Sequence, residues 1–293
     1  MSGILEKKIG EFRLSATCGN ARTGELTTAH GAFQTPAFMP VGTQGTVKGV
    51  TPAELRSLGA QILLSNTYHL HLRPGDELIQ SLGGLHRFMG WDGPILTDSG
   101  GYQVFSLAKL RKLTAEGVTF RSHIDGAEVA FTPERVVKIQ ENLGVDILMV
   151  LDECLAFPAT FAEAEASLAI TLKWAKQSQL ARAKRDTVLA FGIVQGGMHE
   201  QLRIRACEEL VALEFNGYAI GGLSVGEPQE LMLQMAAVST QHLPSNQVRY
   251  LMGVGTPQDI IKAVGVGIDM FDCVIPTRSA RFGRLYTKTG HLN

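Results

Sequence analysis

Short apolar runs recur along the chain, and each of them ends in small or polar residues. Near-continuous hydrophobicity over so few residues is typical of parallel strands that are covered on both faces. The runs occupy residues 36–42, 61–67, 94–99, 146–153, 188–196, 217–224, 248–255 and 270–277. The pattern therefore predicts eight parallel strands.

Amphipathic segments between these runs predict helices. Three segments begin at a Thr-Pro pair, namely Thr51-Pro52, Thr132-Pro133 and Thr256-Pro257. A threonine side chain can cap the free N–H groups of a helix, and proline at the first helical position gives up no useful donor. Further helices are expected over residues 75–89, 160–184, 199–215 and 228–242.

Alternation of strands with helices predicts a parallel sheet, and eight units favour a closed (β/α)8 TIM barrel. A doubly wound open sheet is the alternative. Residues 11–35 are expected to form antiparallel strands before the barrel, and residues 118–131 an inserted hairpin that turns at Asp125-Gly126. We expect residues 1–293 to form a single catalytic barrel domain.

The end of the chain departs from this plan. Residues 284–293 resemble a strand and a turn, so the eighth helix that normally lies across the last and first strands is missing. Either apolar surface is left uncovered there, or the N-terminal strands cover it. The interpretation we favour is a C-terminally truncated chain.

Composition sets limits on location and partners. With 45% hydrophobic and 19% charged residues, the chain has the profile of a folded protein. Its net charge of −1 means that nucleic-acid binding would need a local basic patch. The N-terminus lacks a signal peptide and no run is long enough to span a membrane, so a cytoplasmic location is expected. The four cysteines lie far apart without a C-x-x-C pair, which indicates neither a zinc site nor a disulfide framework.

Candidate chemistry gathers where the predicted strands end, because active sites of such barrels lie at the carboxyl ends of their strands. Each residue also has a simpler interpretation: Asp98 could cap a helix, Gln195 could mark a turn, and Cys154 and Met252 could be core. Together they are more specific, because independent loops seldom all end in usable polar groups. The strand ends contribute Asp98, Ser99, Tyr102, Asp152, Cys154, Gln195, Gly222, Met252 and Asp272.

These residues favour carboxylate chemistry, since the sequence shows neither a P-loop nor a G-x-S-x-G pattern. Two aspartates could serve as nucleophile and acid/base at an anomeric carbon. A third aspartate and Gln195 could recognise a purine edge, and Tyr102 and Met252 could sandwich a flat ring. The residues alone support glycosyl or pentosyl transfer on a base-bearing substrate.

Long motifs at these positions carry a family resemblance over essentially the whole chain. They are residues 35–43 (TPAFMPVGT), 64–70 (LSNTYHL), 93–105 (GPILTDSGGYQVF), 218–227 (YAIGGLSVGE), 250–255 (YLMGVG) and 269–278 (DMFDCVIPTR). With these motifs the chain resembles the bacterial tRNA-guanine transglycosylases, also called queuine tRNA-ribosyltransferases.

The resemblance implies an enzyme, a pentosyltransferase that acts on tRNA in queuosine biosynthesis. Guanine at wobble position 34 of G-U-N anticodon tRNAs (Asp, Asn, His, Tyr) would be exchanged for 7-aminomethyl-7-deazaguanine. By matching motif, Asp272 is expected to be the nucleophile on ribose C1′, which gives a covalent RNA–enzyme intermediate. Asp98 is expected to help guanine leave and to deprotonate the incoming base.

The resemblance also implies a pocket for the base. Asp152 would pair with the N–H donors of the base, while Gln195 and the Gly222 amide would hold its carbonyl. The Leu223 carbonyl and Glu227 would sense the aminomethyl group. Tyr102 and Met252 would stack on the base, and Ser99 would position the substrate. Cys154 and Val225 match the bacterial form, whose pocket suits a small base. Arg278 and Arg281 would contact the phosphates that flank the target nucleotide.

One departure concerns the zinc-binding part. Family members continue with a C-x-C-x-x-C…H zinc site and helices that grip the tRNA and form much of a homodimer interface. This sequence contains neither the zinc-site motif nor those helices, so we expect this chain to bind no cofactor. Zinc is expected only if the protein continues beyond Asn293, and a homodimer is expected only for full-length family members. The alternatives are a non-catalytic RNA-binding paralogue or inactive fragment, and an unrelated barrel hydrolase of small glycosides.

Overall fold

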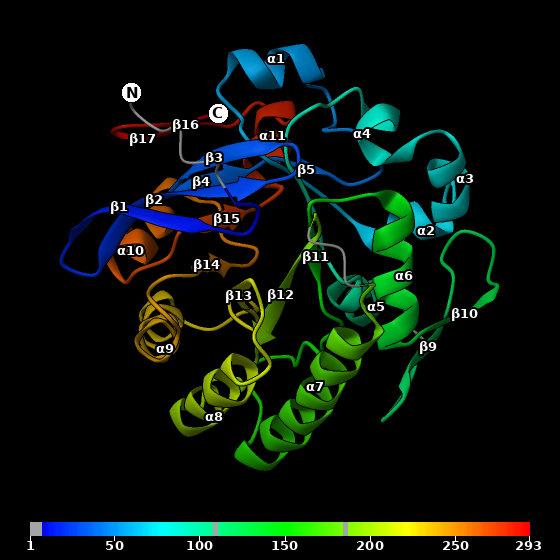
Figure 1. Cartoon of the computed structure of the whole chain (residues 1–293). Coiled ribbons are helices and arrows are strands. Elements are labelled where there is room, and N and C mark those ends of the chain that lie inside the picture. Colours follow the sequence, from blue (N-terminus) through cyan, green and yellow to red (C-terminus); the bar gives the residue numbers. More distant parts are fainter. Residues whose placement is uncertain (1–7, 108–110, 184–186) are drawn as a thin grey trace, which may run out of the picture.

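A parallel sheet that returns to its own first strand forms the centre of the computed structural model, which describes residues 8–107, 111–183 and 187–293 (Figure 1). β4 pairs with β15, and β5 pairs with β6. Only Pro40 separates β4 from β5, so these two segments are the halves of one barrel strand. The sheet is therefore the predicted eight-stranded barrel, and the alternative of an open sheet is wrong. Its strands are β4 (Ala37–Met39), β5 (Val41–Gly42), β6 (Leu63–Ser65), β7 (Ile95–Thr97), β11 (Ile147–Met149), β12 (Leu189–Val194), β13 (Gly217–Ile220), β14 (Val248–Leu251) and β15 (Met270–Asp272).

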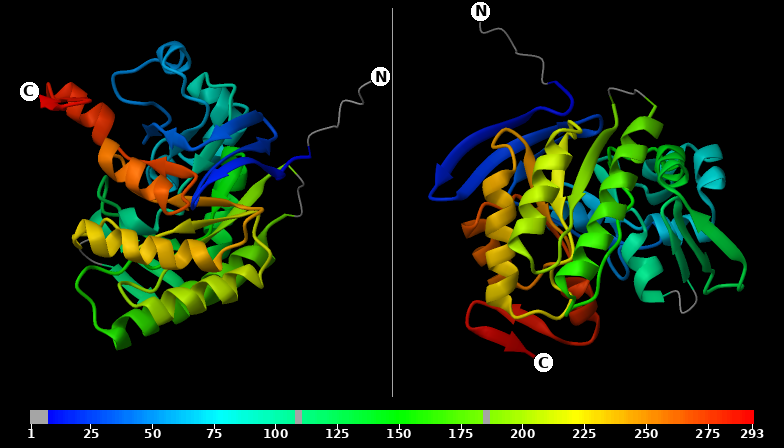
Figure 2. Two further views of the ribbon diagram at one scale, coloured as in Figure 1. Left: turned by 90° about the vertical axis from the view of Figure 1, so that its left-hand side faces the viewer. Right: turned by 90° about the horizontal axis from the view of Figure 1, so that it is seen from below.

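Helices cover the outside of the barrel, and α7, α8 and α9 lie side by side along it (Figure 2). The three expected threonine caps are confirmed: Thr51, Thr132 and Thr256 each accept a hydrogen bond from the backbone three residues on. No helix among the described residues has the length and apolar character needed to cross a bilayer. The helices that alternate with strands are α1 (Pro52–Ser57), α6 (Pro133–Leu143), α7 (Phe161–Ala181), α8 (Glu200–Val211), α9 (Gln229–His242) and α10 (Pro257–Gly265).

Several helical details differ from the prediction. The helix expected over residues 75–89 is two short helices, α3 (Asp76–Ser81) and α4 (Gly84–Met89), because Gly83 adopts a left-handed conformation between them. The short helices α2 (Thr67–Leu72) and α5 (Gly101–Leu107) were not predicted.

The last predicted strand was too long. It ends at Asp272, and α11 (Ile275–Arg281) begins with Pro276 in its first turn, a position that proline favours. Among the described residues, only this short helix and a terminal hairpin follow β15, in agreement with the expected lack of an eighth barrel helix. The hairpin comprises β16 (Leu285–Thr287) and β17 (Gly290–Leu292).

An antiparallel N-terminal sheet covers the ends at which the barrel strands begin. It comprises β1 (Phe12–Cys18), β2 (Ala21–Thr28) and β3 (Gly31–Thr35), as the sequence predicts. The buried Arg22 guanidinium binds the Asp269 carboxylate, at 2.8 and 2.6 Å, immediately before β15. The predicted site residues lie at the opposite end, where the strands finish.

The insertion between α5 and α6 is a three-stranded antiparallel sheet rather than a simple hairpin. The predicted hairpin is confirmed as β9 (Gly117–Arg121) and β10 (Glu128–Phe131), and β8 (Arg111–Thr114) pairs with β9 as an additional strand.

Candidate active site

Asp98 follows directly after β7 and is held at the mouth of the barrel by the loop after β6. Its Oδ2 accepts a hydrogen bond of 2.5 Å from the Asn66 amide, and its Oδ1 accepts one of 2.8 Å from the Thr67 backbone N–H. The Thr67 hydroxyl in turn donates to the Asp98 carbonyl oxygen. Two neighbouring strand ends therefore fix the orientation of this carboxyl group.

The environment of Asp98 suits proton transfer near neutral pH. Burial raises the pKa of Asp98 to about 6. Hydrogen bonds from Asn66, Thr67 and Gln103 favour the ionised form and partly oppose this rise. The nearby carboxylate of Asp272 raises the pKa further through like-charge repulsion. A carboxyl group of this kind can both give and take a proton at working pH.

Asp272 is the last residue of β15, and one of its oxygens is tightly held. Oδ1 accepts hydrogen bonds from the Tyr250 hydroxyl at 2.5 Å and from the Gly253 N–H at 2.8 Å. Burial raises the pKa of Asp272, while these two donors oppose the rise. Within the described part of the chain, Oδ2 has no hydrogen-bond partner, which leaves it available for attack on a substrate.

Asp152, Ser99 and Gln195 form a buried network on three adjacent strands. The Ser99 hydroxyl donates to Asp152 Oδ1 at 3.0 Å, and the Gln195 amide donates to Oδ2 at 2.7 Å. Burial raises the pKa of Asp152, against these hydrogen bonds. The structure therefore brings together three residues that the sequence selected separately, and the Gln195 amide points at Asp152.

Two glycines in the mouth are required by close approaches. A Cβ on Gly101 would lie 2.7 Å from the Asp152 carbonyl oxygen and 2.9 Å from Oδ1. A Cβ on Gly222 would lie 2.3 Å from Gln195 Oε1, and its φ of +64° is one that L-residues rarely adopt. Any side chain at either position would displace the Asp152 network.

The loop after β13 is fixed by Glu227. One carboxylate oxygen accepts from the Ser224 N–H and the other from the Val225 N–H, at 2.9 Å for the latter. The side chain of Leu223 is buried beside this turn. Glu227 therefore controls the conformation of the loop that carries the Gly222 amide and the Leu223 carbonyl.

A pocket adjoins Asp152 between α5, α7 and the inserted sheet. The buried Cys154 contributes to its wall, and burial raises the pKa of this thiol to about 12, so it stays protonated and unreactive. The other lining residues are Gly101, Val104, Arg111, Leu113, Val118, Asp152, Glu153 and Trp174.

The remaining predicted residues lie at the rim. Tyr102 is 53% exposed on α5, and Met252 is half-buried directly after β14. Their stacking on a flat ring stays a prediction. On α11, Arg278 is exposed and Arg281 donates to the Lys48 carbonyl at 2.9 Å.

Some contributors were missed by sequence reasoning. Tyr250 lies inside an apolar run, so its phenol resembled core, and Asn66 and Thr67 follow a strand that had been assigned no chemistry. Arg203 was hidden on the inner face of α8. It is fully buried and donates to the carbonyls of Gly197 at 2.8 Å and Gly221 at 3.1 Å, so it braces the loops that follow β12 and β13.

Comparison with known proteins shows the family of the chain. A family model described as queuine tRNA-ribosyltransferase matches residues 17–293. The chain belongs to the queuine tRNA-ribosyltransferase family. It is a tRNA-guanine transglycosylase, an enzyme whose partners are a tRNA and a nucleobase.

Relatives from several bacteria share the name queuine tRNA-ribosyltransferase. The protein of Solidesulfovibrio magneticus is 56% identical over 97% of this chain, and that of Lawsonia intracellularis 57% over 97%. The protein of Rickettsia bellii is 56% identical over 96%. The matches cover 76%, 77% and 78% of these relatives, so the chain spans about three quarters of their length.

Proposed function

We propose that this queuine tRNA-ribosyltransferase exchanges guanine at wobble position 34 of G-U-N anticodon tRNAs for 7-aminomethyl-7-deazaguanine, as a step in queuosine biosynthesis. The reaction proceeds by two displacements at ribose C1′ through a covalent intermediate. The carrying observation is the pair of aspartates at one mouth: Asp98 with a pKa of about 6, and Asp272 with one oxygen held and the other free of hydrogen bonds among the described residues.

In the first displacement, Asp272 Oδ2 attacks C1′ and the bond from C1′ to guanine N9 breaks. The electron pair of that bond leaves with guanine, and protonated Asp98 supplies the proton that neutralises it. A new C1′–O bond now joins the RNA to Asp272. Tyr250 and the Gly253 N–H hold the other carboxylate oxygen, which keeps the nucleophile oriented.

In the second displacement, ionised Asp98 takes the N9 proton of the incoming base. N9 attacks C1′, the ester bond to Asp272 breaks, and the carboxylate is regenerated. Two inversions at C1′ retain the anomeric configuration, as in a retaining glycosidase. Asp98 ends the cycle protonated, ready for the next guanine.

Base recognition is assigned to the buried network. Asp152 accepts from the N–H donors of the base, with Ser99 and Gln195 fixing its two oxygens. The Gln195 side chain and the Gly222 amide bind the base carbonyl, Tyr102 and Met252 stack on the ring, and Leu223 and Glu227 contact the aminomethyl group. Cys154, which is buried, and Val225 suit a small base rather than bulky queuine.

The tRNA is held by its anticodon loop with the target base flipped out of its stack. Arg278 and Arg281 lie on α11, which begins three residues after Asp272, and they contact the phosphates that flank the target nucleotide. This is the local basic patch that a chain of near-zero net charge needs in order to bind RNA. We place the zinc site of the family in the part of the relatives that this chain does not match.

The test is incorporation of labelled guanine into unmodified tRNA. The chain should incorporate label, and a denaturing gel should trap a covalent RNA–protein adduct. Asp272→Asn should abolish both the adduct and incorporation while preserving the fold, because an amide is a poor nucleophile. Asp98→Asn should slow adduct formation.

Two outcomes would contradict the proposal. Incorporation that survives Asp272→Asn would remove the assigned nucleophile. RNA binding without any incorporation would favour the alternative of a non-catalytic paralogue or inactive fragment.

A further inference from the structure

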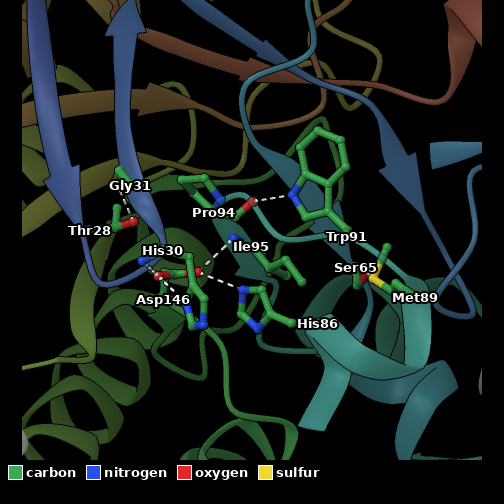
Figure 3. A network of polar contacts seen from close by, with 10 residues as sticks. All are labelled: Thr28, His30, Gly31, Ser65, His86, Met89, Trp91, Pro94, Ile95 and Asp146. Atoms are coloured by element: carbon green, nitrogen blue, oxygen red, sulfur yellow. Dashed lines mark hydrogen bonds and ion pairs between the residues drawn. The ribbon is translucent and has the colours of Figure 1, made fainter. Parts of the chain in front are cut away.

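Two histidines and an aspartate from three separate segments meet at the base of the barrel (Figure 3). His30 lies in the turn between β2 and β3, His86 lies on α4, and Asp146 immediately precedes β11. Asp152 follows β11, so this cluster lies at the opposite ends of the strands from the catalytic mouth. None of the three residues takes part in the proposed reaction.

The ligand-type atoms of the cluster are close together. His30 Nδ1 lies 2.9 Å from Asp146 Oδ1, and His86 Nε2 lies 3.0 Å from Asp146 Oδ2. The two imidazole rings are stacked with their centroids 3.6 Å apart. One ligand atom from each residue lies within 4.8 Å of the other two.

The carboxylate of Asp146 is fixed in place. Its side chain is fully buried, and it accepts hydrogen bonds from the backbone N–H groups of His30 at 3.0 Å and Ile95 at 2.9 Å. A preoriented carboxylate thus faces two imidazoles.

The surroundings hold one histidine rigidly and leave the other accessible. The Trp91 indole, just after α4, donates to the Pro94 carbonyl at 3.1 Å, which anchors the segment that carries His86 (Figure 3). The His86 side chain is 13% exposed, whereas that of His30 is 43% exposed. His30 therefore provides the side from which an ion can enter.

We propose that His30, His86 and Asp146 form a binding site for one divalent first-row transition metal, of which zinc is the best fit. Two imidazole nitrogens and a carboxylate oxygen are ligands that zinc prefers. Tetrahedral metal–ligand bonds of about 2.0–2.2 Å separate neighbouring ligand atoms by roughly 3.3–3.6 Å. The contacts of 2.9 and 3.0 Å between the histidines and Asp146 would therefore need to open only by about half an ångström to admit the ion. The backbone donors to Asp146 act as outer partners that orient the ligand.

The bound metal would have a structural effect. It would link the turn between β2 and β3 to α4 and to the start of β11, and so fasten the N-terminal sheet to the barrel. Cysteine spacing could not predict this site, because its ligands lie at three distant positions and include no thiol. It is also separate from the C-x-C-x-x-C…H site expected of longer family members.

The test uses the 293-residue chain after treatment with a chelator. Titration with Co2+ should give visible absorption bands that saturate at one equivalent, and excess Zn2+ should raise the melting temperature by roughly 5 °C. Both signals should be lost in His86→Ala and weakened at least tenfold in affinity in His30→Ala. Asp146 is left intact because its backbone contacts make it a risk to folding.

Matched controls separate this site from other metal ligands. His242→Ala removes an exposed histidine at the end of α9 and should leave both signals unchanged. Binding that persists in His86→Ala, that keeps its full affinity in His30→Ala, or that is lost in Cys18→Ser would overturn the proposal. So would a wild-type chain whose melting temperature is unchanged by Zn2+, since the cluster would then be a hydrogen-bonded clamp alone.

Discussion

The Tyr250 hydroxyl donates a 2.5 Å hydrogen bond to Asp272 Oδ1, from the strand next to the one that carries the aspartate. Burial and the adjacent carboxylate raise the pKa of Tyr250 well above its ordinary value, so the phenol stays protonated and remains a donor. This pairing stabilises the ionised form of Asp272, and Oδ2 keeps no hydrogen-bond partner among the described residues. The phenol would therefore help to activate the nucleophile that we propose.

Tyr250→Phe should lower kcat/KM about 10- to 100-fold, because a hydrogen bond to a charged group contributes roughly 1.5–3 kcal/mol. Without this donor the pKa of Asp272 rises further. Since the nucleophile must be ionised, the acid limb of covalent-adduct formation should move to higher pH. A pH profile of single-turnover adduct formation measures this shift. Tyr218→Phe, a buried tyrosine on the neighbouring β13, should leave rate and profile unchanged.

Asp98 should make the protein less stable as pH rises. Its folded pKa of about 6 lies above the ordinary value of 3.8, so the folded state binds the proton more tightly than the unfolded state. The stabilising contribution is complete below about pH 4 and is lost as pH rises through about 6, at a cost of up to about 3 kcal/mol.

Asp98→Asn, which is neutral at every pH, should therefore raise the free energy of unfolding at pH 7 by about 1–3 kcal/mol while abolishing exchange. Urea denaturation at pH 4 and pH 7 measures the difference, which should vanish at pH 4. A variant that is less stable than wild type at both pH values would show that the hydrogen bonds to Asn66 and Thr67 outweigh the burial of charge.

The barrel could be predicted from sequence because its strands are buried on both faces and read as short apolar runs. The positions of Asp98, Asp152 and Asp272 followed from where those runs end. The short helix α2 could not be predicted, since it is stabilised by tertiary contacts such as that between the Thr67 N–H and Asp98.

Other parts of the site depend on spatial proximity that no sequence pattern encodes. Tyr250 looks like a core residue until β15 is paired with β14. The buried Arg203 looks like a charged position on an ordinary helix until its carbonyl partners at Gly197 and Gly221 are placed. The same holds for His30 and His86, which meet only because the N-terminal sheet folds under the barrel.

Gly101→Ala should weaken base binding at least tenfold, because the new methyl group would overlap the carbonyl oxygen and Oδ1 of Asp152. The effect should appear in KM for the base and leave KM for tRNA nearly unchanged, which steady-state kinetics can separate. Gly265→Ala is the matched control. Its Cβ meets nothing within 4 Å at the end of α10, so it should be neutral or stabilising by up to about 1 kcal/mol.

Arg203→Met should remove the brace between the loops after β12 and β13. The carbonyls of Gly197 and Gly221 would lose their donor, and each loss should lower the free energy of unfolding by about 1–3 kcal/mol. Because these loops shape the base pocket, KM for the base should rise more than KM for tRNA. Arg203→Lys should lower KM for the base part of the way back, because lysine can still donate to one carbonyl. If Arg203 only filled space, lysine would not restore KM better than methionine does. Arg205→Met, on the same helix but exposed and paired with Glu209, should leave both constants unchanged.

Arg278→Ala tests the phosphate contact proposed for α11. Arg278 is exposed, and its helix begins three residues after Asp272, so its charge would lie beside the nucleotide that Asp272 is proposed to attack. Loss of one phosphate contact should raise KM for tRNA about 5- to 10-fold and reduce the slope of log affinity against log salt by about 0.7. KM for the base and kcat at saturating tRNA should stay the same, because Asp98 and the base pocket are untouched. Arg13→Ala removes an exposed arginine from β1 and should change neither the affinity nor the slope. An unchanged salt slope in Arg278→Ala would place the RNA backbone on another surface of the barrel.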